Sequence, residues 1–532
     1  MATIRGLVSA IVPSQYRGMR TSLYASSLLA SLGAAMAVAL AAAPVHAESL
    51  ADAIALAYQT NPQLKAQRAQ LRAVNESYVQ ARAGAGVQIS AQADLGAQQL
   101  DVRSAIPLRR EGSAVSSSVV VSQPLFAGGR IASQIEAAEA EVLSARERLR
   151  QAEADLLQRV IAAYAAVRRD QQILEMSRSG LDVLQRQLDE TQAKVEVREN
   201  TLTDLAQARA RAATSRSALA SFEGQLAISR AQYFNVVGQN PGQLEPEPDL
   251  PGLPPTIDAA FDAAEANNPV LNAAKREEQA TRARIHQARA AFLPSVNLRL
   301  QASRSPNAFY NPSPFTESLT AQAVVTQPLF TSGLNASAVR RAKELNDADR
   351  ESIESTRRNV LQTLAQQWAQ LLAARTSLSS DQASVAAYET AFFGMRQEER
   401  FGLRSTIELL NAQQELISAQ ISLLRNRYNE YTARAGVLNA MGSLSAAALV
   451  PDLEVYDPEA DFDRVKNRWA LPTELVVRAL DGAVAPDIGP PRPARETVTP
   501  ENQAPLPPEP SDAELRAPLR PAAEVMAEPG VN

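Results

Sequence analysis

The chain of 532 residues contains no cysteine and only two histidines, His46 and His286. Without cysteine it can form no disulfide bond, no thiolate metal site and no lipid anchor on an N-terminal cysteine. Two histidines are too few for a His-based zinc cluster and leave little for a Ser-His-Asp triad. The sequence also lacks a phosphate-binding loop and a nucleophile elbow. We therefore expect no catalytic residue, no metal site and no cofactor, and we predict that the protein is not an enzyme.

Aromatic residues (5%), glycine (22 residues) and lysine are also scarce. Alanine, glutamine, arginine and glutamate dominate long stretches, as in long helices with small side chains at their contacts. Only five of the 53 basic residues are lysines, and 58 acidic residues give a formal net charge of −5. The arginines alternate with acidic residues instead of forming a basic patch, which argues against nucleic acid as a partner.

Residues 1–47 have the pattern of an export signal. They carry three arginines and no acidic residue, and an apolar run at 28–43 precedes a small-x-small site that ends at Ala47. This order of features is typical of a cleavable signal peptide. A start at Met19 instead of Met1 would give a signal of more ordinary length. An uncleaved anchor is the alternative, but the run is shorter than the roughly 20 residues that a membrane-spanning helix needs.

The rest of the chain contains an internal duplication. Two short motifs recur in the same order, 207 residues apart for the first and 204 for the second: Asn61-Pro62 with Asn268-Pro269, and Gln123-Pro124-Leu125-Phe126 with Gln327-Pro328-Leu329-Phe330. Several matches in order at a nearly constant offset make chance a poor explanation, so we predict two structural repeats.

Each repeat is predicted to fold as helix, strand, strand, long helix and helix. In the first repeat, alternation of apolar and polar residues begins at Val87 and again at Val115, which predicts two strands with one apolar face. A polar loop is expected at 97–113, and the second strand is expected to end at Pro124, because proline cannot continue a ladder. The second repeat shows the same pattern, with a loop rich in proline and aromatic residues at 306–315.

Apolar residues with helical and seven-residue periods predict the helices. One helix is expected over 50–83, and heptads predict long coiled-coil helices in both repeats. The first long helix, about 127–197, would be a rod on the order of 100 Å long. Such a rod must pack along its length, so we expect a hairpin with the following helix and neighbours on both sides. The hairpin turn of the second repeat is expected near Gly402.

The domain boundaries follow from these patterns. The connector between the repeats has six prolines, and the chain beyond residue 486 is also rich in proline. Trp469 and Leu471 are expected to anchor the segment between the second repeat and this tail. The predicted domains are a signal peptide (1–47), a first repeat (48–238), a connector (239–256), a second repeat (257–442), a C-terminal equatorial segment (443–485) and a disordered tail (486–532).

Four strands of about ten residues, apolar on one face only, have the length and pattern of outer-membrane strands. One chain cannot close them, because the smallest such barrels have about eight strands and an open edge in lipid leaves backbone groups unpaired. Several chains must then pool their strands: two chains would give eight and three would give twelve, enough for a pore. A small soluble sheet beside a coiled coil is the alternative.

Together these motifs resemble the TolC-like outer-membrane channels over about residues 48–445. The resemblance is carried by the export signal, the Asn-Pro and Gln-Pro-Leu-Phe motifs of both repeats, and the segment FGLRSTIELLNAQ at 401–413. It implies a mainly α-helical protein with membrane β-structure. Long coiled-coil hairpins would form a trimeric α-barrel in the periplasm, and four strands per chain would contribute to a shared 12-stranded β-barrel. Its lipid partner would be the outer membrane of a Gram-negative bacterium.

The resemblance also implies a passive exit duct that works with a periplasmic adaptor and an inner-membrane transporter. An ABC transporter and type I protein secretion are preferred, because the missing lipidation cysteine and the long C-terminal extension resemble secretion-type members. A multidrug efflux pump with a proton-driven transporter is the first alternative. A periplasmic coiled-coil scaffold without a pore is the second.

The family closes its channel at the periplasmic tip of the hairpins, which implies site residues here. Glu408 takes the position of one carboxylate in an acidic ring, and Asn411 stands where the family has a second acid. Arg404 matches a residue that ties neighbouring hairpins together, with Thr203 and Asp204 as partner candidates. Threefold symmetry would place three Glu408 carboxylates around a narrow axis, a field that favours cations. The alternative is that these charges are solvated residues of coiled-coil faces.

Overall fold

The computed structural model describes residues 47–102, 108–308, 311–495 and 499–500. The chain divides into two units, Met1–Ala47 and Glu48–Asn532, and the following description concerns the second. The predicted signal peptide, except Ala47, and the predicted tail from residue 501 lie outside the described residues. Within those residues, no helix combines the length and the hydrophobicity that crossing a membrane requires.

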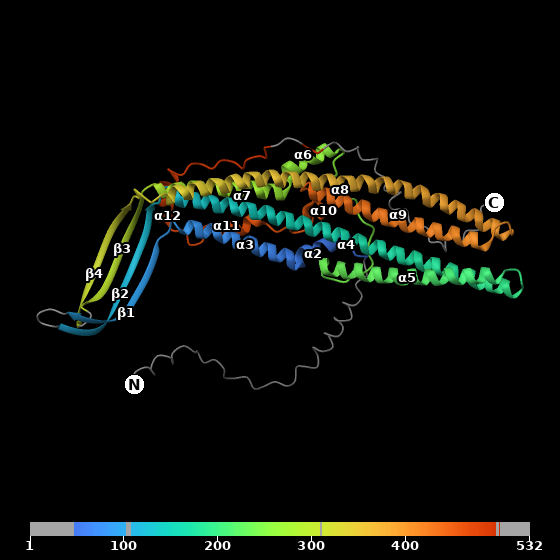
Figure 1. Ribbon diagram of the computed structural model, residues 1–532, viewed down its shortest axis with the longest axis horizontal. Coiled ribbons are helices and arrows are strands. Elements are labelled where there is room, and N and C mark those ends of the chain that lie inside the picture. Colours follow the sequence, from blue (N-terminus) through green and yellow to red (C-terminus); the bar gives the residue numbers. More distant parts are fainter. Residues whose placement is uncertain (1–46, 103–107, 309–310, 496–498, 501–532) are drawn as a thin grey trace, which may run out of the picture. The chain divides into compact units, whose positions relative to one another are not determined.

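Two long helical hairpins dominate the fold, as the heptads predict (Figure 1). Helix α4 (Arg130–Glu196) turns into α5 (Leu202–Val237), and α8 (Leu334–Arg400) turns into α9 (Thr406–Ala440). The two long helices have 67 residues each, so each is about 100 Å long at a rise of ~1.5 Å per residue. The hairpins also pack on each other, because α4 contacts α9 as well as α5.

The heptad residues form the apolar cores along the long helices. Leu364, Leu371 and Leu378 of α8 are 0% exposed, and Ile135 and Leu149 of α4 are buried as well. Burying one such side chain stabilises the fold by ~1.5–3 kcal/mol relative to leaving it exposed. Lateral packing along the rods therefore contributes most of the stability of these long helices.

Each repeat begins with two short helices, where one continuous helix was predicted for 50–83. These are α2 (Leu50–Thr60) and α3 (Pro62–Ala83) in the first repeat, and α6 (Ile257–Asn267) and α7 (Pro269–Arg289) in the second. The prediction of one helix is wrong because the apolar period continues across a break in the backbone. Proline stands at the first position of α3 and of α7, where its missing N–H costs nothing.

The Asn-Pro motif makes this break. The side-chain oxygen of Asn61 accepts hydrogen bonds from the backbone N–H groups of Gln63 and Leu64 at the start of α3 (2.9 and 3.3 Å). Its amide nitrogen donates to the carbonyl of Val236 at the end of α5 (2.9 Å). Asn268 repeats the arrangement with the end of α9. One side chain thus starts one helix and holds the end of another against it.

The four strands form one antiparallel sheet in the order β1-β2-β3-β4. They are β1 (Gln88–Val102), β2 (Leu108–Phe126), β3 (Ser295–Ala308) and β4 (Asn311–Thr326). The sheet leads into both hairpins, because β2 is followed by α4 and β4 by α8 (Figure 1).

The strands are longer than predicted. Pairing continues into both expected loops, with Ala97 opposite Ser113 and Pro306 opposite Phe315. Backbone hydrogen bonds extend the ladder where the side-chain alternation is lost, so the pattern alone understates strand length. Strand β2 also passes the predicted stop at Pro124, with a register shift between Pro124 and Phe126 that accommodates the proline.

The register gathers apolar side chains on one face of the sheet. Among the described residues neither face is covered: Ile89 and Leu319 on the apolar face are 71% and 75% exposed, and Gln88 and Arg299 on the opposite face are exposed too. Strands β1 and β4 each have one edge without a partner strand in the described part of the chain. Two apolar rows cross all four strands, Ile89–Val121–Leu300–Ala321 and Ala91–Val119–Ala302–Leu319, whereas the other face carries rows such as Gln88–Ser122–Arg299–Gln322.

The C-terminal segment is ordered, but not through the predicted anchors. It contains α10 (Ala446–Leu449), α11 (Pro458–Lys466) and α12 (Pro472–Gly482); α11 packs on α3, and α12 packs on β2 and α4. Trp469 is 85% exposed and Leu471 is 46% exposed, so neither side chain anchors the segment. Val477 of α12 and Phe462 of α11 pack in an apolar cluster with Tyr78 of α3 instead, and Arg82 of α3 pairs with Glu474 of α12 (3.3 Å).

Both proline-rich segments run as extended chain along helices. The connector 239–256 lies against α9, where the Tyr431 hydroxyl donates to the carbonyl of Pro248 (2.8 Å). Arg434 of the same helix pairs with Asp249 (2.7 Å). The connector is therefore extended, as predicted, and is also bound in place.

The first part of the predicted tail is bound too. Gln279 and Arg282 of α7 donate to the carbonyls of Gly489 and Pro490 (3.0 Å each). Disorder is therefore the wrong prediction for 486–495. Proline prevents a helix there, but the carbonyl groups of an extended chain remain free to accept hydrogen bonds.

Candidate functional site

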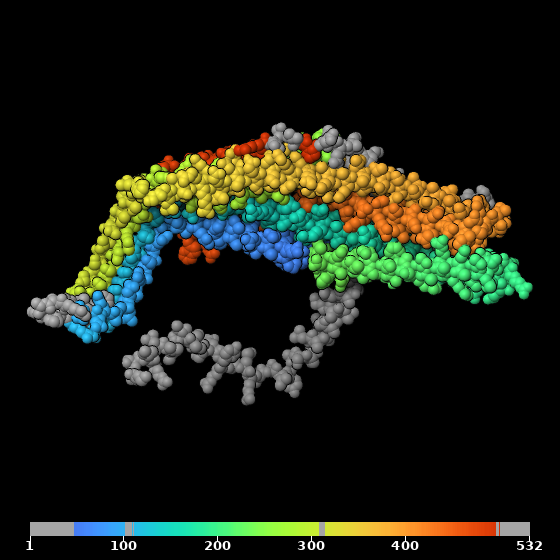
Figure 2. Space-filling view, viewed as in Figure 1, coloured from blue at the N-terminus to red at the C-terminus, as the bar shows by residue number. Residues whose placement is uncertain are grey.

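The two hairpin turns lie at the same end of the hairpins, in green and orange in Figure 2. Their apolar side chains point into solvent: Val197 and Leu202 of the first turn are 66% and 76% exposed, and Phe401 and Leu403 of the second are 78% and 75% exposed. Four large apolar side chains that are exposed at one end of the described part of the chain form a surface suited to contact with another protein. All five predicted site residues stand in or beside these turns.

Asp204 acts inside the first turn. Its carboxylate accepts from the backbone N–H of Thr201 (3.0 Å) and from the Thr201 hydroxyl (2.7 Å), and the hydroxyl accepts from the Asp204 N–H (3.2 Å). This reciprocal pair caps the start of α5. The bonds from Thr201 hold the pKa of Asp204 below its usual range. The neighbouring Thr203 is exposed.

Glu408 has the same place in the second turn. Its carboxylate accepts from the backbone N–H and the hydroxyl of Ser405 (3.0 Å each), and so caps the start of α9. These bonds, followed by one from Arg404, lower the pKa of Glu408. The turn itself needs Gly402, whose φ of +71° is a conformation that other residues adopt only with strain.

Arg404 links the two helices of the second hairpin. Its guanidinium donates to Glu398 at the end of α8 (2.8 Å) and to Glu408 at the start of α9 (3.1 Å). Within the chain it is not paired with Thr203 or Asp204. The resemblance assigns that pairing to a neighbouring hairpin, and the structure brings only Arg404 and Glu408 of the predicted set into contact.

Asn411 links the two hairpins. Arg211 of α5 donates to its side-chain oxygen (2.6 Å) across 200 residues of sequence. A weaker contact joins Lys194 of α4 to Glu399 of α8 (3.6 Å). Sequence reasoning missed Arg211, Lys194 and Glu399, because no local pattern marks residues that meet only when two distant helices pack side by side.

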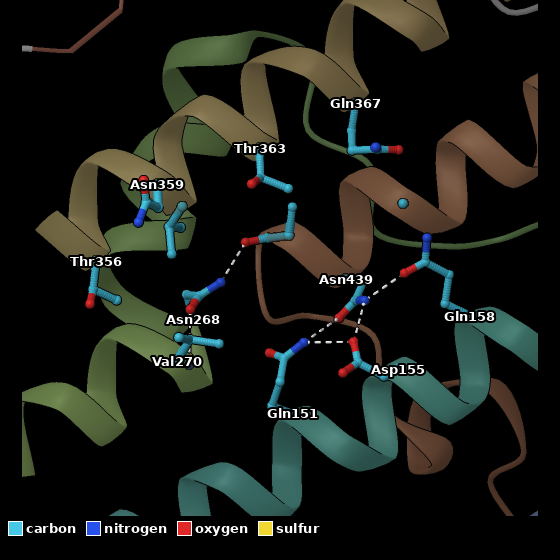
Figure 3. Close-up of a pocket in the computed structure, with 13 residues that line it drawn as sticks. Gln151, Asp155, Gln158, Asn268, Val270, Thr356, Asn359, Thr363, Gln367 and Asn439 are labelled. Atoms are coloured by element: carbon cyan, nitrogen blue, oxygen red, sulfur yellow. Dashed lines mark hydrogen bonds between the residues drawn. The ribbon is translucent and has the colours of Figure 1, made fainter.

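A second candidate is a polar cavity of about 370 Å³ lined by residues of α4, α7, α8 and α9 (Figure 3). Asp155 is the one carboxylate among its lining residues, and it accepts from Gln151 (2.7 Å) and Asn439 (3.0 Å). Asn439 also donates to Gln158 (2.5 Å). The polar side chains of α4 and α9 in the cavity therefore hydrogen-bond to one another. The lining has no cluster of acidic residues that would ligate a metal ion.

A bare amphipathic sheet, two linked hairpins and capped turns define the subunit of an outer-membrane channel, and the comparison with known families agrees. Residues 53–239 and 260–443 match the family described as outer membrane efflux protein. The chain belongs to this family, whose members are passive outer-membrane channels and not enzymes. The resemblance to TolC-like channels and the location in the outer membrane are thus confirmed.

Individual relatives are similar over most of the chain. The outer membrane efflux protein BepC of Brucella suis is 28% identical over 80% of this chain and 91% of its own length. The alkaline protease secretion protein AprF of Pseudomonas aeruginosa is 26% identical, over 64% and 72%. The crystal structure of the Campylobacter jejuni CmeC outer membrane channel has the same fold, with a TM-score of 0.67 at 13% identity over 78% of this chain and 89% of that one.

Proposed function

We propose that three copies of the chain form a channel through the outer membrane. The sheet carries this proposal: it is apolar on one face, polar on the other, and open at β1 and β4. In lipid, every unpaired backbone group costs several kcal/mol, so both edges need partner strands. Two copies would give a barrel of eight strands, and side chains would fill its interior. Three copies give a barrel of twelve with room for a polar lumen.

The hairpins continue the channel into the periplasm. Three copies contribute six hairpins, and each chain already shows how two of them pack through α4, α5, α8 and α9. Repetition of that contact between copies closes a ring of helices below the barrel. The exposed apolar residues at the turns are then available to a periplasmic adaptor protein.

The mass of the particle and its conductance test this proposal together. Protein extracted from outer membranes with detergent should have the mass of a trimer by light scattering and should conduct ions in planar bilayers. A monomer that is soluble without detergent would contradict the channel. A folded trimer that never conducts would favour the periplasmic scaffold.

We infer that the hairpin turns are the gate of this channel. Glu408 is positioned by Ser405 and Arg404 at the exposed end of the second hairpin, where three copies would bring three carboxylates together. Arg404 and the link from Arg211 to Asn411 hold the tip in shape. Asp204 and Thr203 of the next copy remain the proposed partners of Arg404 across the subunit boundary.

Substitutions at the tip test the gate. Glu408→Ala should weaken the block of current by multivalent cations added on the periplasmic side, and Arg404→Ala should raise the open fraction. Arg209→Ala, an exposed position on α5, is a matched control. If the cation block and the open fraction stay as in the wild type, these residues do not line the constriction.

For the cargo we propose unfolded polypeptide, passed on from an ABC transporter through an adaptor in type I secretion. The absence of a lipidation cysteine and the similarity to a relative named for protease secretion support this. The longer match to a relative named an efflux protein favours drug efflux with a proton-driven transporter as the second candidate. Deletion of the gene separates them: loss of secreted proteins supports secretion, and increased drug sensitivity with an intact secretome overturns it.

A further inference from the structure

The two strand-to-helix joints have the same backbone. Strand β2 enters α4 through Gly128 and Gly129, with φ of +67° and +85°. Strand β4 enters α8 through Ser332 and Gly333, with φ of +50° and +84°. Neither long helix has a side-chain cap from its own first residues.

The surroundings of the joints differ. At the first joint the carboxylate of Asp481, 0% exposed, accepts from the N–H groups of Ala127, Gly129, Ile131 and Ala132 (2.7–3.1 Å). Asp481 belongs to α12, which therefore covers this joint. The second joint has no such cover in the described part of the chain.

The uncovered joint is strongly apolar. Leu329, Phe330 and Leu334 are 92%, 87% and 70% exposed, and we call these three residues the β4–α8 joint. The repeat-equivalent Leu125 and Phe126 of the first joint are only partly exposed, because β3 pairs beside them. The exposed set marks the place where a neighbour of β4 is missing.

Helix α12 has the opposite of the usual surface pattern. It turns Glu474, Val477 and Asp481 inward, where they are buried. Outward it presents Leu475, Val476 and Leu480, 67%, 58% and 51% exposed, which we call the outer face of α12. A helix that buries acids and exposes aliphatic side chains has an apolar partner outside this chain.

The repeats predict how the next copy approaches. The Gln of each Gln-Pro-Leu-Phe motif donates to an equivalent carbonyl, Gln123 to Ala85 and Gln327 to Phe292 (2.8 and 3.0 Å). The two donors lie 204 residues apart and the two acceptors 207, which confirms the offset from β2 to β4 and the offset from β1 to β3. Pairs of β2 with β3 can therefore be converted into pairs of β4 with β1 of the next copy.

The conversion places the two apolar surfaces together. Val121 opposite Leu300 becomes Val325 opposite Ala93 of the next copy, and Phe126 opposite Val296 becomes Phe330 opposite Ile89 of the next copy. Ile89 lies three residues after Gly86, where an added Cβ would lie 3.4 Å from the carboxylate of Glu474 in α12. The β4–α8 joint of one copy thus arrives beside α12 of the next.

We propose that α12 is a docking site between subunits: its outer face covers the β4–α8 joint of the next copy. The proposal rests on the channel of three copies and adds to it the register of the β4–β1 boundary and a role for the C-terminal segment. The segment then serves both joints, the first through Asp481 within the chain and the second through its aliphatic outer face across the boundary.

Because the chain has no cysteine, pairs of introduced cysteines report the contacts directly. Val325→Cys with Ala93→Cys should form disulfide-linked dimers and trimers in isolated outer membranes, since directly opposite residues have Cβ atoms about 4.5–5.5 Å apart. Val325→Cys with Ala97→Cys is the control on the same face, about 13 Å further along the strand. Linking of the control pair in place of the first overturns the register.

Phe330→Cys with Leu475→Cys tests the docking of α12 with a short bismaleimide linker. It should shift the protein from the monomer band to dimer and trimer bands, whereas Phe330→Cys with Val455→Cys, an exposed position further from α12 in the same segment, should not. Each single-cysteine variant must remain unlinked and reach the outer membrane.

The remaining outcomes separate the two proposals. If the register pair links but the Phe330 and Leu475 pair does not, the channel stands and the docking of α12 is overturned. Quenching of Trp469 fluorescence by brominated lipid would then identify the membrane surface as what covers α12, since the other tryptophan, Trp368, is 0% exposed. If neither pair links and the particle is monomeric, the proposed channel itself fails.

Discussion

The first repeat and the second repeat differ in what holds their long helix to the sheet. The carboxylate of Asp481 in α12 caps the start of helix α4. Arg82 of α3, in the same repeat, also pairs with Glu474 of α12 (3.3 Å). Helix α8 starts at Gly333 without a side-chain cap. The two repeats therefore have the same backbone at their strand-to-helix joints, but the C-terminal segment, which is not part of the duplication, covers only the first joint.

The difference shows where a buried charge is useful. A carboxylate taken out of water is stable only when its oxygens are fully hydrogen-bonded. The start of α4 supplies four N–H groups and the positive end of the helix dipole at one point, so Asp481 can be fully buried there. The start of α8 is left for the neighbouring copy to complete.

Replacing Asp481 by alanine removes this difference and should have the largest effect. Loss of the cap and of its interaction with the helix dipole is expected to destabilise the protein by about 2–4 kcal/mol. Asp481→Asn, which keeps one accepting oxygen, should fall in between. Denaturant unfolding of the detergent-purified protein measures the change, and trypsin cleavage at Arg130 reports local opening of the joint.

Asp487, an exposed acid beyond α12, provides the control. Asp487→Ala should change stability by less than about 0.5 kcal/mol, as surface substitutions usually do. Equal stability of the two alanine variants would mean that α12 stays attached without its carboxylate, and the asymmetry between the joints would lose its importance.

Substitutions at the two Asn-Pro breaks should destabilise the two repeats equally. Asn61→Ala and Asn268→Ala each remove a helix cap and a bond to the end of the next hairpin, 2.9 and 2.8 Å long. Each is expected to cost about 1–3 kcal/mol, and the two losses should agree within the error of the unfolding curves. Gln70→Ala, exposed on α3, should have little effect. A large difference between the two asparagines would show that the halves unfold separately.

Much of the fold could be predicted from sequence because helices and strands each impose their own spacing on the buried apolar residues. Heptads such as Leu364, Leu371 and Leu378 report one buried stripe, and alternation from Val87 reports one apolar sheet face. Strand length could not be predicted in the same way. Ladder bonds at Ala97 and Pro306 involve the backbone and leave no mark on side-chain alternation.

The site was predictable only in part, for a related reason. Arg404 and Glu408 lie four residues apart on one turn, so their contact is local. Asp481 meets α4 across some 350 residues of sequence, and Arg211 meets Asn411 across 200. Such contacts are decided by how the helices pack, which neither spacing nor composition records.

Acid should affect both hairpin turns. The pKa of Asp204 and that of Glu408 are both lowered, so each cap contributes stability that is complete above the ordinary carboxyl pKa and is lost as pH falls through the lowered value. Glu408 keeps an additional partner in Arg404. Hydrogen exchange at the two turns, followed downward from neutral pH, should therefore rise at 201–204 and at 405–408 once the carboxylates take up protons.

Removal of Arg404 provides the matched comparison. Arg404→Ala should move the rise in exchange at the second turn to higher pH, because one of the bonds that lower the pKa of Glu408 is lost. Asp204→Asn should abolish the pH response of the first turn only. Exchange that does not depend on pH at either turn would show that the caps do not control opening of the hairpin ends.

The smallest effect is expected from the link between the hairpins at Lys194 and Glu399, 3.6 Å apart. Lys194 is bound first by Glu190 of its own helix (2.8 Å), which is the main reason that its pKa is raised. A double-mutant cycle with Lys194→Gln and Glu399→Gln should give a coupling of about 0.2–1 kcal/mol or less, smaller still in high salt. A larger, salt-resistant coupling would mean that this ion pair joins the two repeats at the tip, whereas the present geometry assigns that role to packing of α4 on α9 and to the bond from Arg211 to Asn411.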